Sequence, residues 1–318
     1  MRRLGDTDIE VFPFCLGGNV FGWTIDEQRS FEVLDAYVAA GGNFIDTADV
    51  YGGRGAGQGA SERIIGSWMA SRGNREQLVI ATKVGFAEGV GGLARETILR
   101  AIDLSLERLQ TDRVELYYAH ADDANVPLEE TLGAFGELIE QGKIRHAAAS
   151  QYGAERLARA LELGGSEGRA RYAVLQTQYN LLERDYEREL QPLCERVGLP
   201  CAPFFSLARG FLTGKYRRDG AEVASPRAAG VRESYFTEQG FHALESLDEV
   251  ARAHASTPAA VALAWLAAQP TVVAPIASAT SVEQLSELTA SAGLELAPSE
   301  LERLSAAGIG DRGPASRG

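Results

Sequence analysis

The chain has 318 residues, of which 45% are hydrophobic and 24% are charged, as is typical of globular proteins. Its net charge of −13 argues against a nucleic-acid partner, because contact with many phosphates needs a basic surface. The start carries no apolar segment of signal-peptide length, and nowhere do about 18 apolar residues run together, so we expect no membrane span. The three cysteines, Cys15, Cys194 and Cys201, form no Cys-x-x-Cys pair, which predicts reduced thiols in a soluble, cytoplasmic protein.

Strand and helix patterns alternate along the chain after a predicted hairpin, whose turn is at residues 5–8. Short apolar runs predict eight buried strands, at 14–17, 43–46, 78–83, 114–120, 143–150, 174–178, 201–205 and 272–276. The first helix is expected to begin at the capping box Thr-Ile-Asp-Glu at 24–27 and to end at Gly41-Gly42. Helical periodicity predicts further helices at 61–71, 94–109, 128–141, 154–163, 182–197, 244–254 and 258–268.

Eight buried strands that each have a helix beside them favour an α/β fold closed into a (β/α)8 TIM barrel. An open doubly wound sheet is the alternative, but no Gly-x-Gly-x-x-Gly follows the first strand. We predict a single domain, 1–318, with an N-terminal β-hairpin and extra C-terminal helices at 282–292 and 298–307. The segments 52–59 and 215–238 read as irregular loops on the ligand-binding face of the barrel, and the tail 308–318 is expected to fray.

Polar residues stand at the ends of three successive predicted strands. These are Asp46, Lys83 and His120, and Tyr51 lies in the loop after Asp46. In a barrel the carboxyl ends of the strands meet at one face, so the four side chains can converge on one pocket. A free tyrosine has a pKa of roughly 10; a neighbouring lysine favours the phenolate, and an aspartate keeps that lysine charged. The set therefore predicts proton transfer to a carbonyl oxygen, with the histidine orienting that oxygen or passing on a proton.

Each of these residues also has an ordinary structural explanation. Tyr51 could pack within its loop, Lys83 could reach solvent, His120 could be a core histidine, and Asp46 could cap the next turn. The repeated placement of one polar residue at each strand end is what favours catalysis. The pair Asp122-Asp123 lacks further ligands at a suitable spacing, so we predict no metal site.

These residues lie in motifs that resemble those of the aldo-keto reductases, in particular the branch of potassium-channel β-subunit-like and bacterial aldo/keto reductases. The segment 46–52, Asp-Thr-Ala-Asp-Val-Tyr-Gly, is similar to the family signature Asp-Thr-Ala-x-x-Tyr-Gly. Further segments that resemble the family are 81–83, 116–120, 142–145, 176–182 and 207–216. The similarity runs in order from about residue 3 to about residue 304, which is nearly the whole chain.

The resemblance implies a hydride-transferring enzyme with a nicotinamide cofactor, in which Tyr51 is the general acid in reduction and the base in oxidation. Lys83 and Asp46 would tune Tyr51, and His120 would place the carbonyl. By the same resemblance Phe204 would stack on the nicotinamide ring. The other implied cofactor residues are Gly18, Asn19, Asp46, Ser150, Gln151, Gln176, Ser206, Leu207, Ala208, Arg209, Lys215, Arg227, Ser278, Thr280, Gln284 and Glu287.

The choice between NADPH and NADH rests on few residues. The segment 278–287 lacks the arginine or lysine that many members of the family direct at the 2′-phosphate, and Leu288 replaces a common asparagine. Lys215 and Arg227 match positions that face the cofactor phosphates in the potassium-channel-like branch. We therefore favour NADPH, with NADH as the alternative.

For a small-molecule carbonyl substrate, apolar walls are expected from Phe21, Trp23 and Phe86, with Tyr235 and Phe236 as further candidates. The leading interpretation is a reductase of aldehydes or ketones. Two others remain: a nicotinamide-sensing binding protein with weak or vestigial reductase activity, and a barrel that acts on phosphorylated sugars without redox chemistry. The family resemblance is compatible with a monomer or a small homo-oligomer.

Overall fold

The computed structural model describes residues 1–52 and 57–309, so part of the predicted loop 52–59 and nearly all of the predicted tail lie outside the described residues. The chain opens with a hairpin of β1 (Arg2–Arg3) and β2 (Glu10–Val11), which pair antiparallel as predicted. Seven parallel strands follow in the sheet order β8-β7-β6-β5-β4-β3-β9. They are β3 (Cys15–Gly17), β4 (Phe44–Asp46), β5 (Val79–Val84), β6 (Val114–Ala119), β7 (Ile144–Ser150), β8 (Leu175–Gln176) and β9 (Ile276–Ala277).

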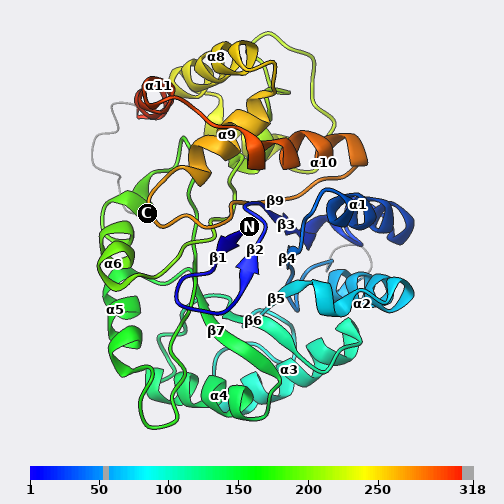
Figure 1. The fold of residues 1–318 in the computed structure, drawn as a ribbon, viewed down its shortest axis with the longest axis vertical. Coiled ribbons are helices and arrows are strands. Elements are labelled where there is room, and N and C mark those ends of the chain that lie inside the picture. The colour runs from blue at the N-terminus through cyan, green and yellow to red at the C-terminus, as the bar shows by residue number, and fades with distance from the viewer. Residues whose placement is uncertain (53–56, 310–318) are drawn as a thin grey trace.

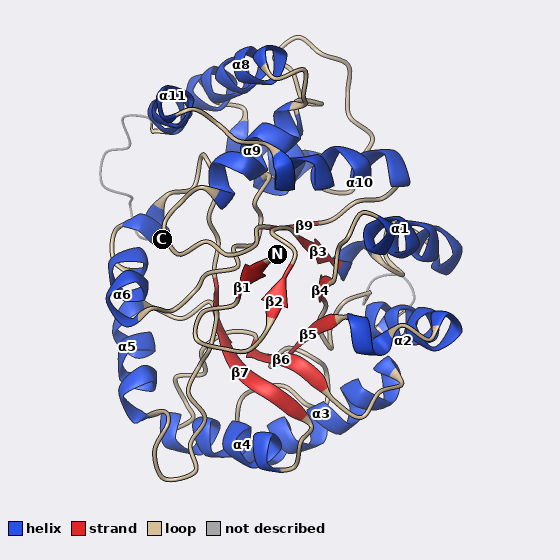
Figure 2. Ribbon diagram, in the orientation of Figure 1, coloured by secondary structure: helices blue, strands red, loops and turns tan. Residues whose placement is uncertain are grey.

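The sheet curls into a barrel, and the helices form a ring outside it (Figure 1; Figure 2). The helices of this ring are α1 (Glu27–Ala39), α2 (Ala60–Arg72), α3 (Arg95–Leu109), α4 (Leu128–Glu140), α5 (Ala154–Leu163), α6 (Leu190–Val197), α9 (Pro258–Ala267) and α10 (Val282–Thr289). Three more are α7 (Ala228–Tyr235), α8 (Glu238–Ala253) and α11 (Pro298–Gly308), and α8 and α11 pack side by side at one edge of the molecule (Figure 1). The predicted α/β barrel with its hairpin and C-terminal helices is confirmed. Within the described ranges no helix is both long and apolar enough to cross a lipid bilayer.

The predicted seventh strand, 201–205, is the main departure within the barrel. Cys201 forms single bridges to Leu175 on one side and Val272 on the other, so backbone hydrogen bonds still join the two edges of the sheet. A regular strand does not form because Pro203 has no N–H to donate and because Phe205 has a positive φ of 50°. Pro275 similarly shortens the last strand, which was predicted at 272–276 and is observed at 276–277.

Several helix boundaries differ from the predictions for local reasons. Asp26, not Thr24, is the N-cap of α1, because its side chain accepts from the backbone N–H of Arg29. Helix α6 begins at residue 190 rather than 182, because the Asn180 side chain accepts from two backbone N–H groups and forms a turn there. Helix α8 begins at residue 238 rather than 244. Thr237 is its N-cap, and the Thr237 side chain accepts a hydrogen bond from the backbone N–H of Gly240. The segment 215–238, predicted as an irregular loop, contains α7.

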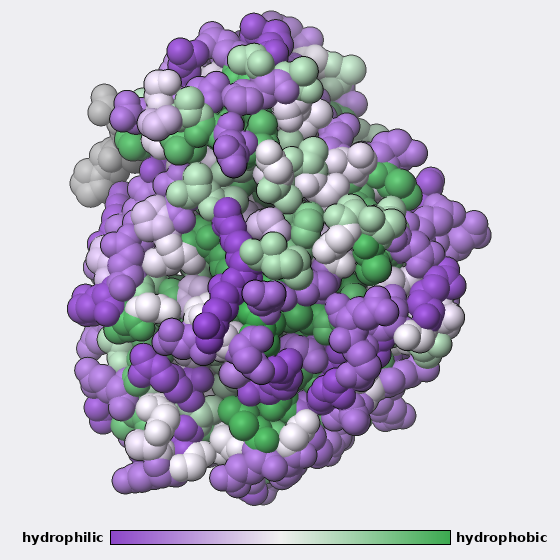
Figure 3. Space-filling model, in the orientation of Figure 1, coloured by the Kyte–Doolittle hydropathy of each residue, from purple (hydrophilic) through white to green (hydrophobic). Residues whose placement is uncertain are grey.

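The core has two parts because strand side chains alternate between the two faces of the sheet. The larger part lies between the strands and the helices. The smaller part fills the barrel, and Leu4, Ile9 and Val11 of the hairpin close it at the amino ends of the strands. The face of the molecule that carries the hairpin is mostly hydrophilic, with smaller hydrophobic patches between polar side chains (Figure 3).

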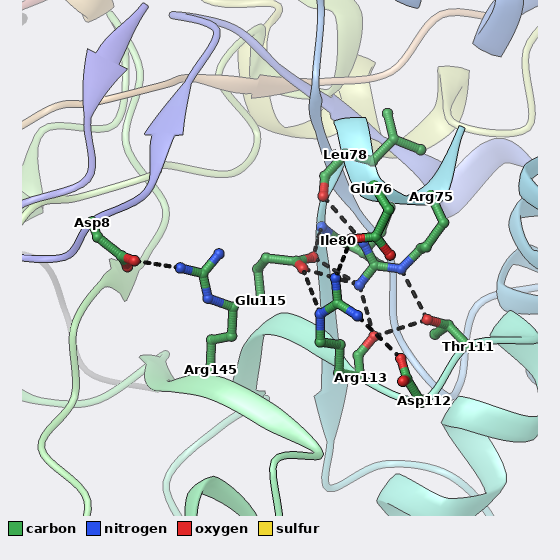
Figure 4. A network of polar contacts seen from close by, with 10 residues as sticks. All are labelled: Asp8, Arg75, Glu76, Leu78, Ile80, Thr111, Asp112, Arg113, Glu115 and Arg145. Carbon is green, nitrogen blue, oxygen red and sulfur yellow. Dashed lines mark hydrogen bonds and ion pairs between the residues drawn. The ribbon is translucent and has the colours of Figure 1, made fainter. Parts of the chain in front are cut away.

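A buried carboxylate anchors this closed end of the barrel (Figure 4). Glu115 of β6 accepts two hydrogen bonds of 3.0 Å from Arg75 and one of 2.8 Å from the N–H of Ile80. Arg113 extends the network to Glu76 at 2.6 Å, and beside it Arg145 contacts Asp8 of the hairpin turn. Because these contacts lie at the amino ends of the strands, they stabilise the barrel and leave the opposite end free for a site.

Candidate active site

Alternation along the strands directs six side chains of the proposed site into the same end of the barrel. The residue two positions before each of them belongs to the smaller part of the core, which fills the barrel. Examples are Phe44, Ala81 and Tyr118. Side chains two positions apart on extended backbone share a face, so the next such position, in a strand or directly after it, points into the barrel at its carboxyl end. The six are Asp46, Lys83, His120, Ser150, Gln176 and Phe204.

The four predicted catalytic side chains lie together. The Lys83 ammonium is fully buried and donates to Asp46 Oδ2 at 2.6 Å and to the carbonyl of Thr47 at 2.7 Å. It also donates to the hydroxyl oxygen of Tyr51 at 3.4 Å. The rings of Tyr51 and His120 are 6.0 Å apart, edge to face. Asp46, Tyr51 and His120 line a cavity. Lys83 does not line this cavity, but it contacts Asp46 and Tyr51, which do.

Burial and the neighbouring charges act in opposite directions on the two central groups. Burial raises the pKa of Tyr51, the Lys83 ammonium opposes this effect, and the Asp46 charge supports it, so that the net shift is upward. Burial by itself would lower the pKa of Lys83, but Asp46 and Tyr51 raise it above its ordinary value. Tyr51 therefore holds its proton and Lys83 its charge near neutral pH. The predicted effect of Lys83 toward the phenolate is present, but burial outweighs it.

His120 is neutral at the cavity wall. Burial, and then the nearby Lys83 charge, lower the pKa of His120 well below its ordinary value. Its ring packs against Phe86 with centroids 4.7 Å apart, and its backbone carbonyl accepts from Gln151 Nε2 at 2.9 Å. Within the described ranges Nδ1 of His120 is buried without a hydrogen-bond partner. A neutral imidazole can donate one hydrogen bond to a substrate oxygen.

Two further buried carboxylates, Asp49 and Glu62, lie near the segment that carries Tyr51. Glu62 of α2 accepts from Thr82 Oγ1 at 2.5 Å and from Arg108 Nε at 2.6 Å, and so links α2 to β5 and α3. Asp49 is 1% exposed, and in the described part of the chain neither of its carboxylate oxygens has a hydrogen-bond partner. Burial, followed by the charge of Glu62, raises the pKa of Asp49 to about 7. The backbone N–H of Asp49 also donates to the backbone carbonyl of Lys83, which ties this segment to strand β5.

The cavity has a volume of about 1150 Å³ and opens at the carboxyl ends of the strands. Most residues that the resemblance assigns to a cofactor line it. They are Asn19, Asp46, Ser150, Gln151, Gln176, Phe204, Ser206, Leu207, Arg209, Lys215, Arg227, Ser278, Thr280, Gln284 and Glu287. This volume is somewhat above the range of about 300–1,000 Å³ that is usual for small-molecule sites.

Ser150 and three cations give this cavity the character of a site for a polar, anionic ligand. Ser150 is 1% exposed, and its Oγ has no hydrogen-bond partner among the described residues. Arg209, Lys215 and Arg227 have no carboxylate within 4.0 Å in the described ranges. Burial, and then the charge of Arg227, lower the pKa of Lys215; burial, and then Arg209, lower that of Arg227. An anionic ligand would relieve this repulsion, as the phosphates of a nicotinamide dinucleotide would.

The backbone near Arg209 bends around the cavity in an uncommon conformation. Phe205, Ala208 and Arg209 have positive φ values of 50°, 48° and 56°. Such values are costly for residues other than glycine and concentrate at binding sites. Ser206, Leu207, Ala208 and Arg209, which the resemblance implies at the cofactor, lie in or next to this segment.

Some predicted residues do not line the cavity. Gly18 and Ala208 are buried and are not part of the cavity wall. The carbonyl of Gly18 accepts a hydrogen bond from Ser61 Oγ at 2.8 Å. Phe21 is fully buried and therefore packs in the core. Trp23 and Phe86 also do not line the cavity, but each contacts a residue that does: the Arg227 guanidinium lies over the Trp23 ring at 5.3 Å, and Phe86, which is 53% exposed, packs on His120.

The remaining candidates, two aromatic residues and an acidic pair, make contacts with other residues of the fold. Tyr235 is buried and donates from its hydroxyl to Glu183 at 3.0 Å, and Phe236 packs on Phe211 with centroids 6.1 Å apart. Asp122 pairs with Arg156 at 2.9 Å, and Asp123 accepts from the backbone N–H of Leu93 and Asn125. These contacts hold the loop after β6.

Sequence reasoning missed part of the cavity wall. Thr24, Ile25, Asp26 and Arg29, at the start of α1, line the cavity beside the segment 278–287. In the sequence Arg29 reads as a charged residue on the solvent face of a helix. A signal was available, because in a (β/α)8 barrel the amino end of each helix lies at the carboxyl end of the preceding strand.

Comparison with known proteins agrees with this geometry. The sequence profile of the aldo/keto reductase family matches residues 13–309. A norsolorinic acid reductase of Emericella nidulans is 33% identical over 312 residues, which cover 92% of this chain and 77% of that protein. Protein tas of Escherichia coli is 33% identical over 339 residues, with 96% of each chain covered. An aryl-alcohol dehydrogenase of Pestalotiopsis microspora is 30% identical, over 93% of this chain and 78% of that protein. This chain belongs to the aldo/keto reductase family.

Proposed function

We propose that this protein reduces an aldehyde or a ketone to the alcohol, reversibly, with Tyr51 as the proton donor and NADPH as the favoured cofactor. The observation that carries the proposal is the position of the Tyr51 hydroxyl. It lies at the cavity wall, 3.4 Å from the buried Lys83 ammonium, which in turn contacts Asp46 at 2.6 Å. Family membership supports the general reaction, the reduction of a carbonyl group.

The protonation states of Tyr51 and Lys83 explain how the proton would be transferred. Tyr51 holds its proton near neutral pH, and the Lys83 charge beside it stabilises the phenolate that remains after the proton leaves. In reduction the O–H bond of Tyr51 breaks and the proton moves to the carbonyl oxygen, while one hydride adds to the carbonyl carbon. In oxidation the Tyr51 phenolate takes the proton back from the alcohol.

His120 orients the substrate in this proposal. Because its imidazole is neutral, it can donate a hydrogen bond to the carbonyl oxygen from the side opposite Tyr51. The two rings are edge to face with centroids 6.0 Å apart, so one substrate oxygen would be within reach of both side chains.

A nicotinamide cofactor, when bound, supplies the hydride. Ser150 and Gln176 would hold its carboxamide, since Ser150 Oγ lacks a partner in the described part of the chain and Gln176 is fixed to Asp46 Oδ1 at 2.9 Å. Phe204 would support the ring through its aromatic face. Arg209, Lys215 and Arg227 would bind the phosphates.

For the substrate we propose an aromatic aldehyde or ketone. Phe86 presents an exposed ring next to His120, and the Trp23 ring packs against Arg227, which lines the same cavity. A ring of the substrate can stack or pack edge-on against these side chains. The name of the aryl-alcohol dehydrogenase relative supports this choice.

The test measures oxidation of NADPH and of NADH with a panel of aryl and alkyl aldehydes and ketones. We expect turnover by the wild-type protein, and a loss of at least about 100-fold in kcat for Tyr51→Phe, because that change removes only the transferable proton. Affinity for the cofactor should stay within about twofold of wild type. Tyr152→Phe is the matched control: it removes a buried hydroxyl that contacts Tyr172 at 2.9 Å and does not line the cavity. Equal kcat in wild type and Tyr51→Phe would refute the role of Tyr51.

A further inference from the structure

One corner of the cavity has no cation from its own segment of chain. Between residues 278 and 287 the cavity is lined by Ser278, Thr280, Gln284 and Glu287. Ser278 Oγ donates to Asn19 at 2.7 Å, and the N–H and hydroxyl of Thr280 donate to Gln284 Oε1 at 3.1 and 3.0 Å. These contacts preorganise a polar wall, but none of these side chains carries a positive charge.

A cation reaches the same corner from a distant part of the sequence. Helices α1 and α10 pack against each other, and Arg29 in the first turn of α1 lines the cavity with the residues above. Its charge is also felt by the first turn of α10. The pKa of Glu283 there is lowered by a hydrogen bond from Ser281, then by its own backbone N–H, and further by Arg29.

The Arg29 guanidinium is only weakly engaged within the protein. Its ion-pair partner is Glu32, at 3.8 Å, and the two side chains are 55% and 45% exposed. Exposed pairs of this kind contribute little to stability. Asp26 lies nearby, but its carboxylate accepts from the backbone N–H of Arg29 at 2.9 Å and serves as the helix cap. An arriving phosphate can therefore take the guanidinium without breaking a strong interaction.

We propose that Arg29 binds the 2′-phosphate of NADPH and sets the preference of this protein for NADPH over NADH; this inference rests on the proposed function, in which a nicotinamide dinucleotide occupies the cavity. A guanidinium offers a phosphate two parallel hydrogen bonds in addition to charge, whereas the 2′-hydroxyl of NADH offers neither a charge nor a second acceptor. Arg29 thus supplies from α1 the cation that the segment 278–287 lacks.

The acidic neighbours sharpen the expected effect. Asp26 and Glu287 line the same cavity as Arg29. In Arg29→Ala these two carboxylates remain, and a carboxylate repels a phosphate and can accept a hydrogen bond from a ribose hydroxyl. Removal of Arg29 should therefore reverse the cofactor preference as well as weaken NADPH binding.

The experiment measures dissociation constants for NADPH and NADH from the change in nicotinamide fluorescence, without substrate. For Arg29→Ala we expect NADPH binding about 10- to 100-fold weaker and NADH binding within about threefold of wild type. Arg29→Lys should recover part of the NADPH affinity, since it restores the charge but not the paired donors. Arg100→Ala, an exposed arginine on α3 that does not line the cavity, is the control and should change neither constant.

A second probe separates this corner from the nicotinamide end. Adenosine 2′-monophosphate and adenosine 5′-monophosphate are titrated as competitors of bound NADPH, and only the first should lose potency in Arg29→Ala. Equal losses for NADPH and NADH, or for the two monophosphates, would overturn the role of Arg29 and leave the proposed function intact. If the wild-type protein binds neither dinucleotide, the proposed function fails, and this inference fails with it.

Discussion

The Lys83 ammonium and the Asp46 carboxylate meet at 2.6 Å, with side chains only 0% and 4% exposed. Both side chains are buried, and the Asp46 carboxylate helps to keep Lys83 charged, because it raises the pKa of Lys83 against the effect of burial. Gln176 Nε2 donates to the second carboxylate oxygen of Asp46 at 2.9 Å, which helps to orient the carboxylate toward Lys83. The acidity of Tyr51 therefore depends on a residue that does not itself contact the Tyr51 hydroxyl.

Asp46→Asn tests this dependence. Burial opposes the charge on Lys83, so without the carboxylate the pKa of Lys83 should fall and Tyr51 should lose its stabilising cation. We expect kcat to fall by about 100-fold or more and the free energy of unfolding to fall by about 3–5 kcal/mol, as when one partner of a buried pair is removed. Rate–pH profiles and urea unfolding measure the two effects.

The control for that variant is Asp103→Asn. Asp103 forms an exposed ion pair with Lys143 on the outside of the barrel, so its removal should cost less than about 1 kcal/mol and leave kcat unchanged. If Asp46→Asn behaves like this control in both measurements, the buried pair does not hold the charge on Lys83.

Asp49 should make stability depend on pH in an unusual direction. Its pKa rises to about 7 on folding, through burial and then Glu62, from roughly 3.9 in the unfolded chain. Between these values the folded state keeps a proton that the unfolded state has released. The contribution of Asp49 is thus fully present at low pH and is lost as the pH rises to about 7, by up to about 4 kcal/mol.

Asp49→Asn removes this titration. The difference in unfolding free energy between the variant and the wild type should shift in favour of the variant as the pH rises from about 5 to about 8, and should level off above that. Denaturant unfolding of both proteins across this range measures the shift. A difference that stays constant with pH would mean that Asp49 is ionised throughout, and the expectation would be wrong.

Two glycines of α4 offer a paired test of packing. A Cβ added at Gly136 would lie 1.8 Å from the carbonyl oxygen of Gly168, whereas one added at Gly133 meets nothing within 4 Å. Gly136→Ala should lower the unfolding free energy by about 3 kcal/mol, because backbone must move. Gly133→Ala should raise it by about 0.5–1 kcal/mol through helix propensity. Thermal unfolding of both variants decides, and equal effects would contradict the observed approach of residue 168 to α4.

Most of the fold and the centre of the candidate site were predictable because they depend on local patterns. Strand ends and alternation place Asp46, Lys83 and His120 on one face of any parallel barrel, whatever the details of packing. Helix α5 was predicted at its observed limits, 154–163, from its helical periodicity. Regular, repeated elements can be predicted in this way because each carries its own signal.

The errors occur where a single residue or a distant contact decides. Pro203 interrupts the predicted seventh strand, and Asn180 replaces the first turns of the predicted sixth helix by a side-chain turn. Helix α7 was missed because much of its support is tertiary: Val231 and Tyr235 are buried, and Tyr235 stacks on Phe211 at 5.7 Å. Phe21 was expected in the substrate pocket, but its ring is fully buried.

By itself, the sequence determined the (β/α)8 architecture, the four polar residues at and beyond the strand ends, and the family to which they belong. Only the tertiary structure decided which of the many remaining side chains share the cavity, the burial that raises the pKa of Tyr51, and the meeting of α1 with α10 that brings Arg29 to the segment 278–287. The physical reason is the distance along the chain over which each effect acts. Periodicity and capping act over a few residues, whereas burial, electrostatic fields and the wall of a cavity arise from side chains that are hundreds of residues apart in the chain.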